Sequence, residues 1–156
     1  MNKKDKLKWY KREFEDISKQ ISQKEFLSYQ DFLRIRNFKL QNSTIEEEKH
    51  IQKITNEAFK LAWKDEIEDA LKKLLELNGV AIPIASTILA MKYPERYSII
   101  DVRVLKALNK GEWIKGNKYK KDTKIYRDYI FLMRKIKPSN MSLRDYERSL
   151  FEGISS

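Results

Sequence analysis

The chain has 156 residues, a length typical of one domain with a core of ordinary size. It contains no cysteine, which excludes disulfides, thiolate nucleophiles and a cysteine-ligated iron–sulfur cluster. The formal net charge of +10 is concentrated in residues 103–137, where twelve Lys and Arg accompany three acidic residues. This concentration is typical of a surface that binds a polyanion, although a solvated lysine-rich surface has the same composition.

No segment has the composition of a leader or a membrane span. The N-terminal residues are basic but lack an apolar h-region, so they do not resemble a secretory signal. The longest apolar segment, residues 80–91, is interrupted by Pro83 and is too short to cross a bilayer. We therefore expect a soluble cytoplasmic protein, a monomer, with no membrane association.

Apolar residues recur at helical spacing along the whole chain, and no segment alternates with period two. Stripes that include Leu7 and Phe26 predict two N-terminal helices. Ser43 with Glu46 is typical of a capping box and predicts the start of a third. The sequence therefore predicts an all-α fold, a compact multi-helix bundle that forms a single helical domain over residues 1–156.

The centre of the chain, residues 67–93, predicts two helices joined by a tight turn. The first helix runs into the sequence LNGVA, where Gly79 can adopt the positive φ that a C-cap or hairpin needs. Pro83 is tolerated in the first turn of the next helix. That helix is apolar on nearly every side, which predicts a position at the centre of the core.

After a short apolar run, Asp101 stands at the expected start of another helix, which ends near Asn109. Residues 111–124, GEWIKGNKYKKDTK, have little periodicity and predict a loop. A further helix is stopped by Pro138, and Ser142 with Asp145 forms a second capping-box pattern that opens the last helix.

The run LNGVAIPIAS followed by IIDVR resembles the signature of the helix-hairpin-helix DNA glycosylases, the endonuclease III superfamily. The family pattern is L-P-G-V-G, a helix of small residues, and then V-D before a further helix. Gly79 precedes Asp101 by 22 positions, the spacing expected in that family. The resemblance covers the middle third of the chain. It implies a glycosylase-like fold, double-stranded DNA with a damaged or modified site as the partner, and a role in DNA repair.

Three positions depart from the family pattern. Ala81 replaces the second hairpin Gly, Asn78 replaces the frequent Pro, and Val102 follows Asp101 where Thr is usual. In bifunctional members a Lys that forms a Schiff base stands at the position of Pro83. The resemblance therefore implies a monofunctional glycosylase, unless a lysine from elsewhere, such as Lys92 or Lys106, reaches the site.

The turn at 79–81 predicts a phosphate contact, because backbone N–H groups ahead of a helix start point the same way. An ordinary connection between packed helices has the same sequence pattern. The expected DNA contacts in this turn are Gly79, Val80, Ala81 and Ile82. The resemblance adds a structural Na⁺ or K⁺ ion held by the backbone carbonyls of Leu75, Leu77 and Val80.

Asp101 has two compatible interpretations. Asp is a favourable N-cap, and backbone N–H groups that bind a carboxylate fix its position and favour its charged form. A fixed carboxylate can also stabilise the positive charge that develops on a sugar when its bond to a base breaks. The resemblance makes Asp101 the catalytic residue.

The basic segment after Asp101 supplies the remaining expected DNA contacts. Trp113 and Tyr119 are candidates for base stacking, because they lie among lysines without periodic neighbours. The full set is Arg103, Lys106, Trp113, Lys118, Tyr119, Lys120 and Lys121. The sole histidine, His50, supports neither a Ser-His-Asp triad nor a zinc site, and its neighbours predict an exposed position.

Three hypotheses follow for function. The first is a monofunctional DNA N-glycosylase that excises a base with Asp101 and requires no cofactor. The second is a non-catalytic helix-hairpin-helix module that binds DNA and uses Asp101 only as a helix cap. The third is a helical protein-interaction domain whose basic face meets an acidic partner.

Overall fold

The computed structural model describes residues 1–39 and 46–155, and all regular secondary structure in these ranges is helical. The predicted all-α class is therefore confirmed. The helices are α1 (Lys3–Ile21), α2 (Tyr29–Phe38), α3 (Glu48–Trp63), α4 (Ile67–Leu74), α5 (Ile82–Lys92), α6 (Val102–Ala107), α7 (Gly111–Ile114), α8 (Thr123–Ile136) and α9 (Leu143–Ser155). A 3₁₀ helix, η1 (Lys115–Lys120), follows α7.

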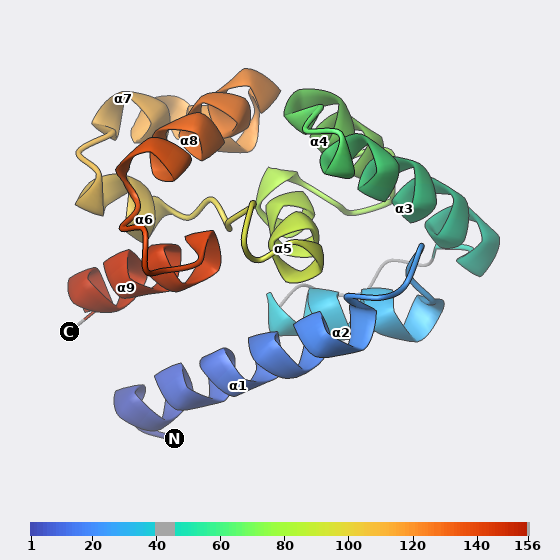
Figure 1. The fold of residues 1–156 in the computed structure, drawn as a ribbon, viewed down its shortest axis with the longest axis horizontal. Coiled ribbons are helices and arrows are strands. Elements are labelled where there is room, and N and C mark those ends of the chain that lie inside the picture. Colours follow the sequence, from blue (N-terminus) through green and yellow to red (C-terminus); the bar gives the residue numbers. More distant parts are fainter. Residues whose placement is uncertain (40–45, 156) are drawn as a thin grey trace.

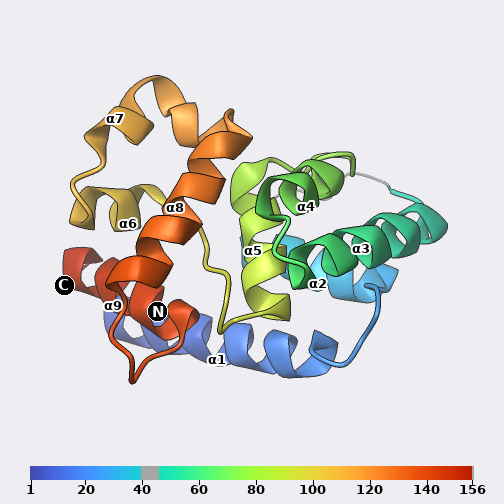
Figure 2. The same ribbon diagram turned by 45° about the horizontal axis from the view of Figure 1, so that its top comes forward.

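Helix α5 lies at the centre of the molecule, with α3 and α4 on one side and α6 to α9 on the other (Figure 1). Its residues are buried throughout, apart from a half-buried Pro83, as expected for a helix that is apolar on all sides. Helix α1 runs along one edge of both groups and packs against α2 and α5 (Figure 2). The two groups also meet directly, where α4 packs against α8.

Lys92, at the end of α5, is buried and caps helix α1. Its ammonium group donates hydrogen bonds to the carbonyl oxygens of Ile21 and Ser22, at 3.2 and 2.9 Å, and to that of Lys24. These carbonyls lie at or just beyond the C-terminus of α1, where backbone acceptors lack helical partners. Lys92 is thus committed to holding α1 on α5, and burial lowers the pKa of its amine.

Several local predictions need correction. Phe26 is exposed and precedes α2, which begins at Tyr29. Ser43 lies outside the described residues, and α3 begins at Glu48 without a side-chain cap. The expected loop at 111–124 is wrong, because it contains α7 and η1. The 3₁₀ helix includes Gly116 and Asn117 at φ 67° and 56°, a left-handed bend that interrupts helical periodicity in the sequence.

The other predicted boundaries agree with the structure. Gly79 has φ 71°, Pro83 lies in the first turn of α5, and α6 begins directly after Asp101. The Ser142 hydroxyl accepts a hydrogen bond from the Asp145 N–H at 3.0 Å, as a capping residue should. No helix in the described part of the chain is both long and apolar enough to cross a membrane.

Candidate functional site

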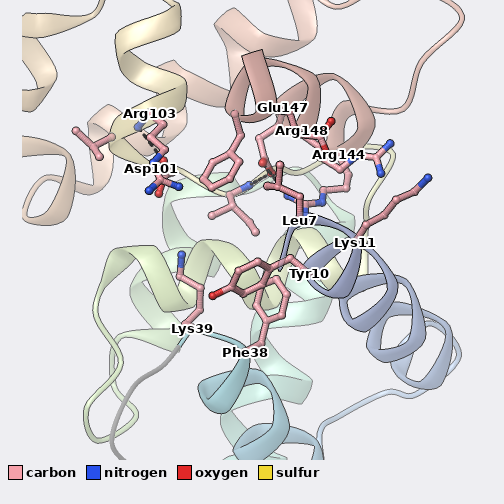
Figure 3. Close-up of a pocket in the computed structure, with 14 residues that line it drawn as sticks. Leu7, Tyr10, Lys11, Phe38, Lys39, Asp101, Arg103, Arg144, Glu147 and Arg148 are labelled. Atoms are coloured by element: carbon pink, nitrogen blue, oxygen red, sulfur yellow. Dashed lines mark hydrogen bonds and ion pairs between the residues drawn. The ribbon is translucent and has the colours of Figure 1, made fainter. Parts of the chain in front are cut away.

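A cavity of about 340 Å³ separates the N-terminal helices from the C-terminal ones and contains Asp101 on its wall (Figure 3). This volume lies at the lower end of the range for small-molecule sites in proteins. One wall is formed by Leu7, Tyr10, Lys11, Phe38 and Lys39 of α1 and the end of α2. The other is formed by Ile99, Asp101, Val102, Arg103, Arg144, Glu147, Arg148, Phe151 and Glu152.

Asp101 is held as the N-cap of α6. Its carboxylate accepts a hydrogen bond from the Arg103 N–H at 2.7 Å, a short distance that is typical of a charged acceptor. The Arg103 guanidinium lies over the Phe151 ring, 4.7 Å from its centroid. The capping interpretation is confirmed, and the capped carboxylate also lines the cavity.

The extended segment before Asp101 is buried, and side chains from three helices bind its backbone. The Ile100 N–H donates to the Ser86 hydroxyl on α5 at 3.1 Å. On α8, the Tyr126 and Tyr129 hydroxyls donate to the carbonyls of residues 98 and 99 at 3.0 and 2.7 Å. Burial raises the pKa of both tyrosines far above the ordinary value, so both remain donors.

Glu147 on α9 completes this support. Its carboxylate accepts the Ile99 N–H at 3.1 Å and both oxygens bind one Arg144 guanidinium nitrogen at 2.7 Å. Burial raises the pKa of Glu147, and the Arg144 charge and its hydrogen bonds oppose that effect. Because Ser86, the two tyrosines and Glu147 together bind the backbone of every residue from 98 to 100, the segment delivers Asp101 to the cavity in a fixed position.

The opposite wall carries aromatic rings and the amines of Lys11 and Lys39. Tyr10 and Phe38 pack edge to face with centroids 5.4 Å apart, and Trp9 stacks on Phe38 at 6.5 Å. Lys39 rises from the end of α2 toward Asp101 and Arg103 (Figure 3). Burial lowers the pKa of the Lys39 amine, and the charges of Asp101 and Glu147 partly oppose this. Within the part of the chain that the structure describes, its ammonium has no hydrogen-bond acceptor.

The turn between α4 and α5 is anchored at Asn78. The Arg36 side chain donates to the Asn78 carbonyl at 3.0 Å, and the Glu46 carboxylate accepts the Asn78 N–H at 3.0 Å. The Val80 N–H is used inside the turn, because it donates to the Leu77 carbonyl at 3.2 Å. Of the backbone N–H groups predicted to contact a phosphate, that of Val80 is therefore already used within the turn.

Gly79 and Ala81 remain as exposed donors in this turn. Within the described ranges, their N–H groups make no hydrogen bond to the protein. Ile82 is buried at the first position of α5. The suggested cation ligands are the carbonyls of Leu75, Leu77 and Val80, and that of Leu77 already accepts one hydrogen bond. The ion remains an implication of the resemblance.

The last turn of α2 connects the turn to the cavity. Arg36 binds the Asn78 carbonyl, while Phe38 and Lys39, two and three residues later, line the cavity. The same helix end therefore contacts the turn and lines the cavity that contains Asp101. Sequence periodicity did not identify this end, because Phe38 and Lys39 look like an ordinary core residue beside an ordinary surface lysine.

The predicted contacts in the basic segment fall into two groups. The exposed cations are Arg103, Lys106, Lys118, Lys120 and Lys121. Tyr119 is buried with 6% exposure, and burial together with the nearby Asp101 charge raises its pKa. Its ring belongs to the core and is therefore not available to stack on a base. Trp113 is half-buried, with the Lys110 ammonium 4.9 Å from its ring centroid.

The alternative lysines do not supply a nucleophile at Asp101. Lys92 caps α1, as described above, and Lys106 is exposed on α6 and does not line the cavity. His50 is half-buried rather than fully exposed, and its Nδ1 lies 2.9 Å from the Glu46 carboxylate. Glu46 is thereby shared between α3 and the turn.

Among the described residues, no group of three or more His, Cys, Asp or Glu side chains is arranged to hold a metal ion. The groups available for chemistry in the cavity are thus the fixed Asp101 carboxylate and, on the opposite wall, the Lys39 amine and aromatic rings. Searches against protein-family models, curated proteins and solved structures found no match to this chain.

Proposed function

We propose that the protein is a monofunctional DNA N-glycosylase with Asp101 as its catalytic carboxylate. The observation that carries this proposal is the position of Asp101, a carboxylate fixed at 2.7 Å from the Arg103 N–H on the wall of a cavity of about 340 Å³. A flipped base needs a pocket with a stacking surface, and Tyr10, Phe38 and Phe151 supply aromatic rings in this cavity.

The role of Asp101 follows from charge. Cleavage of an N-glycosidic bond leaves positive charge on the sugar, and a carboxylate held nearby stabilises that charge more in the transition state than in the bound substrate. Because the segment 98–100 is held by buried side chains, the carboxylate does not have to be ordered during the reaction. The same carboxylate can orient the attacking water.

DNA binding would use the exposed N–H groups of Gly79 and Ala81 together with the cationic surface of α6 and η1. These contacts go to phosphates, so they position the duplex without reading its sequence. Extruding a base costs a few kcal/mol, least at a lesion or mismatch, which makes such sites the expected substrates.

The test is incubation of the purified protein with duplexes that each carry one alkylated, oxidised, deaminated or mismatched base. Abasic sites are revealed by strand scission in hot alkali. We expect scission of at least one duplex by the native protein, and its loss in Asp101→Asn with DNA affinity retained. Unchanged scission by Asp101→Asn would overturn the assignment of the catalytic residue.

A second candidate is a non-catalytic DNA-binding module. It is favoured by one observation: Asp122 makes the same cap at α8, accepting the Lys124 N–H at 2.9 Å, and lies outside the cavity. The Asp101 cap is therefore explicable without chemistry. Salt-dependent binding to every duplex with no abasic product from any of them would favour this candidate.

A further inference from the structure

The cavity has an excess of positive charge. Five of its lining residues are cationic, namely Lys11, Lys39, Arg103, Arg144 and Arg148. Three are acidic, namely Asp101, Glu147 and Glu152. Arg144 and Glu147 form a closed pair, and Arg148 pairs at 3.8 Å with Asp145 outside the cavity lining, which leaves three cations and two carboxylates to face an occupant.

The two walls of the cavity differ in the charged groups that they carry. Asp101 lies on the wall formed by α6 and α9, whereas Lys39 lies opposite, beside the aromatic rings of Tyr10 and Phe38 (Figure 3). A base that stacks on those rings while its sugar faces Asp101 would place its edge near the Lys39 ammonium. Burial lowers the pKa of that amine, and the charges of Asp101 and Glu147 partly oppose the lowering.

We propose that this site selects bases that depart as anions, such as deaminated or oxidised pyrimidines with carbonyl oxygens, and rejects alkylated bases that carry a positive charge. The inference rests on the proposed glycosylase function. In the step considered, the bond between the sugar and the ring nitrogen breaks, and its electron pair goes to the base. The sugar becomes cationic and takes up the hydroxyl of a water molecule, whose proton passes to the departed base anion.

The electrostatic reason is the change in charge at the base. A neutral base becomes an anion as the bond breaks, and a nearby ammonium stabilises that charge only as it develops. An alkylated base begins as a cation and leaves neutral, so an excess of positive charge opposes its binding and gives no help to its departure. We therefore assign to the Lys39 ammonium a direct contact with the departing base.

The experiment compares single-turnover excision from two sets of otherwise identical duplexes. One set carries uracil, 5-hydroxyuracil or thymine opposite guanine, and the other carries N7-methylguanine or N3-methyladenine. Each is tested with the native protein, Lys39→Gln, Lys39→Arg and Lys60→Gln, the last removing an exposed cation of α3 that lies outside the cavity and outside the proposed DNA-binding surface.

We expect excision only from the first set. Lys39→Gln should lower its rate constant by about 10²-fold, as for the loss of one donor to a developing anion, with duplex affinity nearly unchanged. Lys39→Arg should restore most of the rate, and Lys60→Gln should not affect it. Unfolding curves of each variant identify any loss through misfolding.

Preferential excision of the alkylated bases would overturn this inference while leaving the glycosylase function intact. So would a Lys39→Gln variant that excises the first set at the native rate, or one in which Lys39→Arg is as slow as Lys39→Gln. Absence of excision from both sets, with DNA binding retained, would instead remove the glycosylase function on which the inference rests.

Discussion

The connection that precedes α5 lies at the surface and is anchored at one residue, whereas the end of the connection that follows α5, residues 98–100, is buried and is anchored at all three residues. In the first, Arg36 and Glu46 bind the backbone of Asn78 and leave neighbouring N–H groups exposed. In the second, side chains from α5, α8 and α9 bind the backbone at 98–100.

The difference matches what each connection would have to do. Backbone donors that meet a phosphate need exposure, and a turn tolerates some adjustment when DNA arrives. A carboxylate that stabilises a developing charge needs a fixed position, because its contribution falls when it must reorganise. We therefore expect changes near Asp101 to cost more stability than changes in the turn.

The largest effect is expected from Glu147→Ala. Removing one partner of a buried pair leaves the Arg144 charge unpaired, and the Ile99 N–H loses its acceptor. The free energy of unfolding should fall by about 3–5 kcal/mol, measured by urea denaturation. The paired change Arg144→Met with Glu147→Leu removes both charges and should recover much of that loss. A cost below about 1 kcal/mol for Glu147→Ala would mean that α9 does not hold this segment.

A smaller effect is expected from Gly79→Ala in the turn. Gly79 has φ 71°, and an L side chain in this region costs about 1–2 kcal/mol. The matched control is Gly111→Ala, where φ is not in the left-handed region and an added Cβ meets nothing within 4 Å. In urea unfolding, only Gly79→Ala should lower the free energy of unfolding by this amount. Equal losses for Gly79→Ala and Gly111→Ala would show that conformational strain at Gly79 is not the cause.

The smallest effect is expected from Glu46→Gln, and it should depend on pH. Burial raises the pKa of Glu46, but hydrogen bonds from the Asn78 N–H and His50 outweigh it, so the pKa lies below its ordinary value of 4.5. The folded state then binds fewer protons than the unfolded state, so the stabilisation is present above that value and is lost as the pH falls below it.

At neutral pH, Glu46→Gln should therefore cost about 1 kcal/mol, measured by urea unfolding. As the pH falls below 4.5, the difference between the native protein and the variant should shrink. Glu47→Gln is the control, because Glu47 is exposed and makes no side-chain cap bond. A difference that stays constant from pH 7 to pH 3 would contradict the role given to the Glu46 charge.

The structure could be predicted from the sequence best where local chemistry decides the backbone conformation. Gly79, Pro83 and Asp101 each have a conformational preference that acts within a few residues, and all three occupy the expected positions. Periodicity failed at 111–124, because left-handed residues 116 and 117 break the helical repeat while the chain still coils.

The cavity wall formed by α1 and the end of α2 could not be predicted from the sequence. Lys39 and Asp101 are 62 positions apart, and only the packing of α1 and α2 against the C-terminal helices makes them face one cavity. Glu147 has the spacing of an ordinary helical residue, and its role depends on the backbone of residue 99 nearly 50 positions earlier. Tyr119 was misassigned because η1 folds it into the core.

The most direct measurement compares Asp101→Asn with Asp122→Asn. Both residues are N-caps that accept the N–H two positions later, but only Asp101 lines the cavity. Each change should lower the free energy of unfolding by at most about 1 kcal/mol. On the duplex from which the native protein excises a base fastest, single-turnover excision should be abolished in Asp101→Asn and remain at the native rate in Asp122→Asn. Equal excision by the two variants would contradict a catalytic Asp101 and reduce it to a helix cap.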